Sequence, residues 1–252
     1  MPRRMDHPLR VVKLVLVLGP FTLPAQADAE EGPAPYPPTS CYEVRDIEGW
    51  TVLVHEGFLG DHPELAGRTL ELLRVQLYQI VRRVPAEAVE TLRLIRIWVE
   101  EDEPNHPCMA YHPDARWLRE HGMNPEKAGC VEVADARNFL DWTLAQPWMV
   151  LHELAHGYHH RFLDGGFENA AIKGAFERAG EEGRYDSVLH INGKDERAYA
   201  LVNPMEYFAE ATEAFFGTND FYPFVRSELR RHDPEMEELL ERLWMMPGRS
   251  AR

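Results

Sequence analysis

Two histidines and a glutamate in one predicted helix carry the clearest chemical signal of the sequence. The segment Trp148-Met-Val-Leu-His152-Glu153-Leu-Ala-His156 places His152 and His156 four residues apart. Residues at this spacing share one face of a helix, so both imidazoles can reach a single metal ion. Glu153 follows His152 directly and can take a proton from a water molecule at that metal. The pattern predicts a catalytic site with one Zn2+ per chain.

The helix that carries this motif is predicted to be buried. It runs from Pro147 to about Phe162, and most residues around the histidines are apolar. Buried imidazoles without partners are costly, which favours a metal site over two incidental histidines in a core helix. His159 and His160 come too soon on the same helix to complete the site, and we expect them on an exposed polar turn.

A catalytic zinc site needs a third protein ligand and an open position for water. A histidine or aspartate six residues after His156 would give the metzincin arrangement, but that position is Phe162. The remaining candidates are Glu206 and Glu210, four residues apart in a largely apolar helix predicted at 204–216. One can bind zinc while the other accepts a hydrogen bond from a ligand histidine. Ordinary surface acids are the less favoured alternative, because the helix is mostly apolar.

The elements that must position these side chains follow an α+β pattern, with strands first and helices after. Apolar periodicity and turn residues predict strands at 51–55, 92–99 and 130–134, and helices at 65–84, 147–162, 170–179, 204–216 and 234–244. Residues 100–129 are rich in Pro, His, Asn and Gly, and we expect mostly loop there. The prediction is a small sheet packed on the zinc helix, with a mostly helical C-terminal half.

The N-terminal region predicts export. Residues 1–27 combine four basic residues, a short apolar run and the sequence Ala25-Gln-Ala27, which is typical of a cleaved signal peptide. An uncleaved anchor or a disordered tail is the alternative. Residues 28–40 are predicted to be a disordered linker, and 41–252 to be one domain. No later stretch is apolar enough to span a membrane, so we expect a secreted or periplasmic protein.

The charge of the chain argues against nucleic acid as a partner. The formal net charge is -15, and loss of residues 1–27 leaves 23 basic and 41 acidic residues. A surface this acidic repels phosphate backbones and anionic membranes alike. It is compatible with a basic peptide substrate.

Three cysteines are present, and export permits a disulfide. Cys108 and Cys130 flank a polar segment and are the preferred pair, although Cys41 leaves three pairings open. No Cys-x-x-Cys pair exists, which excludes a cysteine zinc knuckle.

The segment from Trp148 to Gly217, roughly a quarter of the chain, resembles the gluzincin peptidases. More narrowly, it resembles the catalytic domain of anthrax lethal factor and related secreted metallopeptidases. In that family, the zinc helix is followed by Tyr-x-x-x-Asn-x-x-Glu, an aromatic residue and Phe-Ala-Glu. Here the corresponding segment reads Tyr199-Ala-Leu-Val-Asn203-Pro-Met-Glu206-Tyr-Phe-Ala-Glu210.

This resemblance implies a zincin-like fold and a role for each matched residue. Glu206 would be the third zinc ligand, Glu210 an outer-shell residue, and Tyr199 a stabiliser of the oxyanion. A core tyrosine is the alternative for Tyr199, and Asn203 is expected only to cap the helix. Family members also pair extended substrate with a short strand before the zinc helix, for which Cys130–Ala134 is the candidate.

The expected function is therefore a zinc metallopeptidase acting on a peptide or protein, as an endopeptidase rather than an exopeptidase. Two alternatives remain open: a zinc hydrolase of another amide or a cell-wall peptide, and a zinc-holding binding module without turnover. An intact Glu153 argues against the binding module, since a structural zinc site has no need of that acid.

Overall fold

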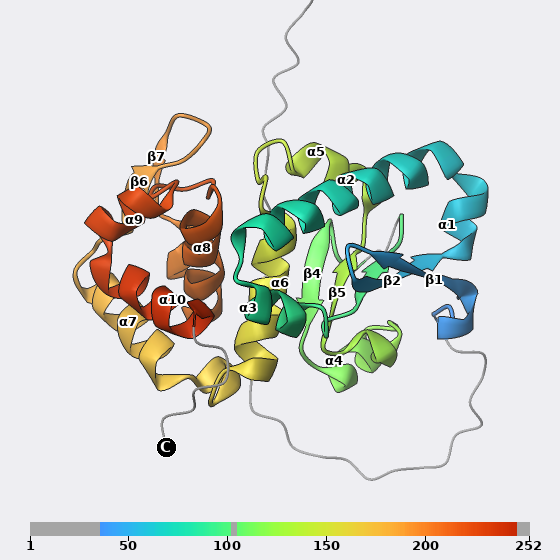
Figure 1. Cartoon of the computed structure of the whole chain (residues 1–252), viewed down its shortest axis with the longest axis horizontal. Coiled ribbons are helices and arrows are strands. Elements are labelled where there is room, and N and C mark those ends of the chain that lie inside the picture. The colour runs from blue at the N-terminus through green and yellow to red at the C-terminus, as the bar shows by residue number, and fades with distance from the viewer. Residues whose placement is uncertain (1–35, 102–104, 246–252) are drawn as a thin grey trace, which may run out of the picture. The chain divides into compact units, whose positions relative to one another are not determined.

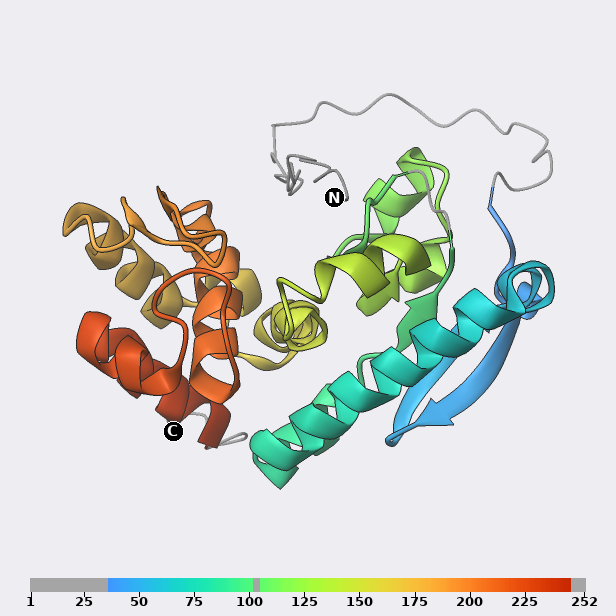
Figure 2. The same cartoon turned by 90° about the horizontal axis from the view of Figure 1, so that it is seen from above.

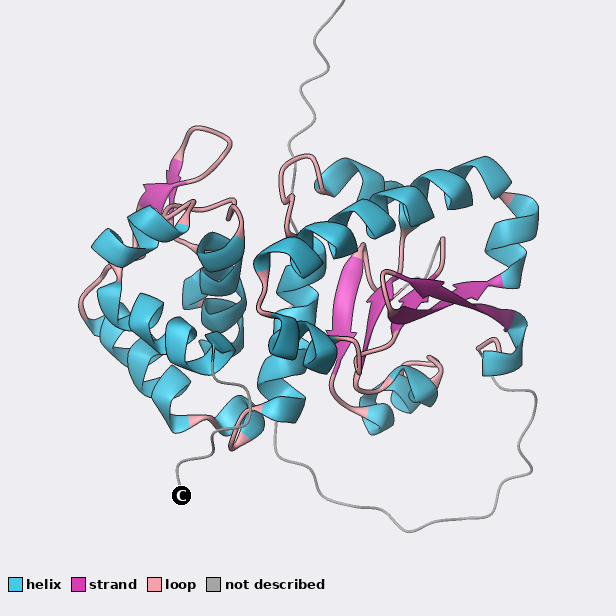
Figure 3. Cartoon of the chain, viewed as in Figure 1, coloured by secondary structure: helices cyan, strands magenta, loops and turns pink. Residues whose placement is uncertain are grey.

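The computed structural model describes residues 36–101 and 105–245, which fall in one compact unit, Ala34–Arg252. The α+β class is confirmed: a small mixed sheet is combined with many helices (Figure 3). The predicted signal peptide and residues 28–35 of the predicted linker lie outside the described residues. Among the helices described, none combines the length and the apolar character that a membrane span requires.

A five-stranded sheet forms the first half of this unit, in the order β1-β2-β3-β5-β4. Its strands are β1 (Tyr42–Ile47), β2 (Trp50–His55), β3 (Ile97–Val99), β4 (Met109–His112) and β5 (Cys130–Val133). The inner pairs β2–β3 and β3–β5 are parallel, and the outer pairs β1–β2 and β5–β4 are antiparallel. The strand β4 therefore forms one edge of the sheet.

Helices supply most of the remaining structure. They are α1 (Glu56–Asp61), α2 (Pro63–Arg83), α3 (Ala86–Leu92), α4 (Ala115–Glu120), α5 (Ala136–Trp142), α6 (Met149–Phe162), α7 (Ala170–Glu181), α8 (Pro204–Phe216), α9 (Arg226–His232) and α10 (Pro234–Met245). Short 3-10 turns precede β1, β5, α7 and α8, the last of them η4 (Tyr199–Leu201). A small hairpin of β6 (Val188–Leu189) and β7 (Asp195–Glu196) lies between α7 and η4.

The helix α6 lies at the centre of the fold, between the sheet edge and the C-terminal helices (Figures 1 and 2). It contacts β4 and β5 on one side and α8 on the other. Both sides of α6 are therefore covered, which explains why nearly all of its residues are buried. The prediction of a buried helix at 147–162 is confirmed.

Two glycines allow close contacts around α6. At Gly157 a methyl group would lie 2.7 Å from Ile95 Cδ1 and 3.0 Å from the Tyr111 ring, so the glycine lets β4 approach the helix. At Gly217, directly after α8, a methyl group would lie 2.0 Å from the indole of Trp148. The start of α6 is thus packed directly against the end of α8.

The two faces of the sheet bury different chemistry. Strand residues such as Val52, Ile97 and Val131 join the main core with α2 and α6. The opposite face buries a small apolar group around Trp98 and, next to it, several charged side chains including Lys127. Alternation along each strand produces this separation.

Several predictions about the N-terminal half are wrong in detail. The strand expected at 92–99 is only Ile97–Val99, because α3 ends at Leu92. The region 100–129 is about half loop, and the elements it also contains, β4, α4 and a 3-10 turn, were not predicted. The strand expected to pair with substrate, Cys130–Ala134, corresponds to β5, which already has β3 and β4 on its two sides. An interior strand has no free edge for another chain.

The expected disulfide is also absent. All three cysteines lie in the described part of the chain, and all three are free thiols. Cys108 precedes β4, whose far end at His112 is opposite Cys130, so the preferred pair lies at opposite ends of the β4–β5 ladder. The sequence alone did not reveal this, because the separation of the two cysteines results from the antiparallel pairing of β4 with β5.

Candidate metal centre

The candidate site is built where α6 and α8 lie side by side in opposite directions. Trp148 at the start of α6 meets Gly217 after α8, and His156 two turns into α6 meets Glu206 in the first turn of α8. Local sequence fixes where α8 begins, because the Asn203 side chain caps it by accepting a hydrogen bond from the Glu206 amide at 2.8 Å. This confirms Asn203 as a helix cap.

Three candidate ligand groups converge at one point. The Glu206 Oε2 atom lies 3.1 Å from Nε2 of His152 and 3.4 Å from Nε2 of His156. Atoms bound at about 2.0–2.1 Å to a tetrahedral zinc ion are roughly 3.3 Å from one another. The two distances from the Glu206 oxygen are therefore close to those between neighbouring ligands of one zinc ion. His152, His156 and Glu206 are the three residues expected from the sequence.

The predicted base lies beside this point and is partly exposed. Ligand atoms of Glu153, His152 and His156 are all within 4.8 Å of one another. The Glu153 Oε2 atom also accepts a hydrogen bond of 2.9 Å from the backbone amide of Tyr111, on the edge strand β4. Glu206 approaches a ring nitrogen of each histidine within 3.4 Å, which makes it the stronger candidate for a third ligand than Glu153.

Tyr199 reaches the same site from η4. Its hydroxyl donates a hydrogen bond of 3.1 Å to Glu206 Oε1, the oxygen that does not face the histidines. Burial raises the pKa of Tyr199, and Glu206 raises it further, so the phenol keeps its proton and remains a donor. Tyr199 is half-buried, as are Glu206 and Glu153, so this side of the site faces solvent.

A glutamate that the sequence analysis did not single out contacts His152 from the buried side. Glu213 Oε1 lies 2.7 Å from His152 Nδ1, whereas the Glu210 Oε1 atom is 4.0 Å from the same nitrogen. Glu206, Glu210 and Glu213 stand at spacings of four and three along α8, which places them on one face of the helix. This spacing could have predicted from the sequence that Glu213 lies on the same face of α8 as Glu206 and Glu210.

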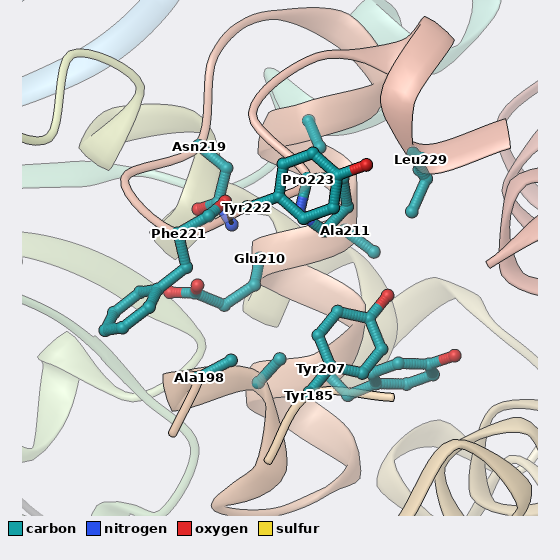
Figure 4. Close-up of a pocket in the computed structure, with 12 residues that line it drawn as sticks. Tyr185, Ala198, Tyr207, Glu210, Ala211, Asn219, Phe221, Tyr222, Pro223 and Leu229 are labelled. Atoms are coloured by element: carbon teal, nitrogen blue, oxygen red, sulfur yellow. Dashed lines mark hydrogen bonds between the residues drawn. The ribbon is translucent and has the colours of Figure 1, made fainter. Parts of the chain in front are cut away.

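Glu210 borders a small cavity, lined by residues of α8 and of the segments around Ala198 and Phe221 (Figure 4). The cavity has a volume of about 10 Å³, room for about one water molecule. Its walls are mostly apolar and aromatic, and Asn219 supplies a second polar group near Glu210.

The electrostatics of the centre are dominated by buried carboxylates. Burial alone would lower the pKa of His152, but hydrogen bonds to Glu206 and Glu213 raise it well above its usual value. Burial would likewise raise the pKa of Glu206, but the adjacent histidines hold it well below its usual range. Burial raises the pKa of Glu213 to about 7. The cluster therefore favours a positive charge among its oxygens.

The expectation for the end of α6 is wrong. His159 is fully buried between Phe167 and Phe208, and His160 is half-buried beside Phe167. His160 Nδ1 is 2.8 Å from the Tyr111 hydroxyl, which ties β4 to α6 a second time. Helical spacing alone could not reveal that both sides of α6 are covered.

Comparisons with known proteins do not assign this site: no protein-family model, curated protein or solved structure matches the chain.

Proposed function

We propose that the chain is a zinc-dependent hydrolase that cleaves peptide bonds, with a zincin-like arrangement of sheet edge, zinc helix and glutamate helix. The observation that carries this proposal is the approach of one Glu206 oxygen to within 3.4 Å of a ring nitrogen of both His152 and His156, with Glu153 next to the two histidines. A structural zinc site would have four protein ligands and no need of a partly exposed acid beside it.

In this proposal each residue has a separate task. His152, His156 and Glu206 hold the zinc ion, which when bound lowers the pKa of water and polarises the scissile carbonyl. Glu153 takes the proton of the attacking water and passes it to the leaving amine. The amide of Tyr111 holds the Glu153 carboxylate in place for that transfer.

Tyr199 is assigned to the oxyanion of the substrate. Its hydroxyl retains its proton and lies at Glu206, within the same group of atoms. A donor so placed can turn from the Glu206 oxygen to the developing negative charge, an interaction worth roughly 2.7–4 kcal/mol per donor in other hydrolases. Replacement of Tyr199 by Phe is expected to lower kcat and leave zinc affinity nearly unchanged.

A peptide substrate is favoured over other amides by the position of β4. This strand forms the edge of the sheet, and it runs beside the helix that carries Glu153. In an antiparallel ladder alternate residues turn their backbone groups away from the neighbouring strand, and the Tyr111 amide, which reaches Glu153, is one of these. Because the Tyr111 amide is taken by Glu153, an extended peptide would pair with the remaining outward-facing backbone groups of this edge and lie across the candidate metal centre.

The direct test is digestion of a diverse peptide pool by the zinc-loaded chain, with products identified by mass spectrometry. The matched control is Glu153→Gln, which keeps the size of the side chain and removes the base. We expect cleavage by the wild type and a loss of about 10²–10⁴ in rate for the variant, with zinc still bound. Equal cleavage by both proteins would exclude Glu153 as the base. No cleavage by a zinc-bound wild type would favour a non-peptide substrate or a binding role.

A further inference from the structure

The two ring nitrogens of His152 face different partners. Its Nε2 lies 3.1 Å from Glu206 Oε2, at the point where the candidate ligands converge. Its Nδ1 lies 2.7 Å from Glu213 Oε1, on the buried side of the ring. A hydrogen bond donated by one ring nitrogen fixes the tautomer and the orientation of the ring, and leaves the other nitrogen to bind a metal.

Glu213 is in a better position than Glu210 to make this bond. His152 lies in the first turn of α6, which packs beside the last turns of α8 because the two helices run in opposite directions. Glu213, one turn further along α8, comes within hydrogen-bond distance, while the Glu210 oxygen stays at 4.0 Å. The resemblance to gluzincins placed the outer-shell carboxylate at Glu210 instead.

The burial of Glu213 is a second indication that this side chain has a specific role. Its side chain is 3% exposed, and its Oε2 atom has no hydrogen-bond partner among the described residues. A buried carboxylate with an unsatisfied oxygen costs free energy, so it is retained where another group needs it. Its short contact, at 2.7 Å, is the one with Nδ1 of His152.

We infer that Glu213 is the positioning residue of the metal centre: it holds Nδ1 of His152 and so directs Nε2 at the metal. This inference rests on the proposed function, because it assigns Glu213 a role toward the same zinc ion. It makes Glu213, not Glu210, the acid whose loss disturbs metal binding through His152.

The test compares Glu213→Gln with Glu210→Gln and with Glu177→Gln, which removes a charge from the exposed face of α7. Zinc affinity is measured by competition with a chelator. We expect Glu213→Gln to weaken zinc binding by about 10–100-fold, the range for loss of an outer-shell partner. Glu210→Gln should weaken it less, and Glu177→Gln should leave it unchanged. A larger loss for Glu210→Gln than for Glu213→Gln would overturn the inference.

A second measurement needs no metal. In the 15N-edited NMR spectrum of the metal-free wild type, we expect a slowly exchanging Nδ1 proton on His152 that shifts in Glu213→Gln and not in Glu210→Gln. Absence of that proton in the wild type would contradict the inference, even if Glu213→Gln failed to fold. A wild type that keeps this proton and binds no zinc would instead contradict the proposed function, and with it any role of Glu213 toward zinc.

Discussion

Two groups of buried charged residues lie on opposite sides of the edge strand β4, and they differ in whether their acidic side chains are matched by basic ones. The sheet cluster lies on the face away from α6 and consists of Glu100, His112, Lys127 and Glu132. The helix cluster lies between α6 and α8 and consists of His152, His156, Glu206, Glu210 and Glu213. Both use the same kinds of side chain, and most members of each are nearly inaccessible to solvent.

The sheet cluster is closed. Lys127 Nζ contacts Glu132 and lies 2.5 Å from Glu100, and His112 Nε2 lies 2.6 Å from the second oxygen of Glu132. Burial would raise the pKa of Glu132, but His112 and Lys127 lower it to about 2. Each carboxylate thus has a basic partner, and the cluster needs no further ion.

The helix cluster has more acids than bases. Three glutamates on α8 face two imidazoles, and Glu213 Oε2 has no hydrogen-bond partner among the described residues. In the sheet cluster the charges are paired, whereas in the helix cluster carboxylates are in excess. A buried excess of carboxylates is stabilised by a bound cation, which distinguishes a candidate site from a structural cluster. Together with the zinc-like spacing of the ligand atoms, it identifies the helix cluster as the candidate metal centre.

Replacement of Lys127 by Met should have the largest effect on stability. It would leave Glu132 and Glu100 buried without their shared cation, at a cost of about 3–5 kcal/mol in the free energy of unfolding. Chemical denaturation measures this cost, and Lys173→Met is the matched control, because Lys173 pairs with an exposed glutamate on the surface. A Lys127→Met chain as stable as the wild type would show that the sheet cluster is not balanced by this lysine.

Replacement of Glu206 by Ala should affect zinc binding and leave the folding of the metal-free chain unchanged. We expect the metal-free chain to fold as the wild type does and to bind zinc more weakly by about 100-fold or more, beyond the range for an outer-shell partner. Chelator competition measures the affinity, and circular dichroism checks the fold. Unchanged affinity would move the third ligand to another acid, for which Glu153 is one candidate.

His159 should make a smaller contribution, which is to the pH dependence of the free energy of unfolding. Burial lowers its pKa to about 3, from a usual value of 6.5, so the unfolded chain takes up a proton that the folded chain excludes. Stability is therefore lost as the pH falls from 6.5 toward 3. Between about pH 7.5 and pH 5 this group should account for a loss of about 2 kcal/mol.

His159→Leu should remove that part of the pH dependence. The free energy of unfolding is compared for the metal-free wild type and the metal-free variant at the two pH values, so that release of zinc at low pH does not contribute. A variant that loses as much stability as the wild type on acidification would assign the effect to other groups.

The sequence predicted the long elements better than the short ones. The helices α2, α6, α7, α8 and α10 have several turns with apolar residues on one face, so local periodicity identifies them. Short elements such as α3, α5, α9 and β4 depend on contacts with distant parts of the chain, which local sequence does not contain. The edge strand was missed for this reason, and the substrate-pairing role was given to an interior strand.

For the candidate site, the motif predicted which residues come together, and it did not predict how their outer partners are arranged. His152, His156 and Glu206 converge because spacing on two helices places each on the facing side. The contact of Glu213 with His152, and that of the Tyr111 amide with Glu153, depend on the packing of α6 against α8 and β4. That packing is a property of the whole domain.

The most direct test of the central claim is anomalous diffraction at the zinc absorption edge from crystals of the zinc-loaded chain. The account predicts a single strong peak contacted by Nε2 of His152, Nε2 of His156 and a carboxylate oxygen of Glu206. A peak between His152, Glu210 and Glu213, whose ligand atoms also lie within 4.8 Å of one another, would contradict it. Absence of any peak at α6 would contradict it equally.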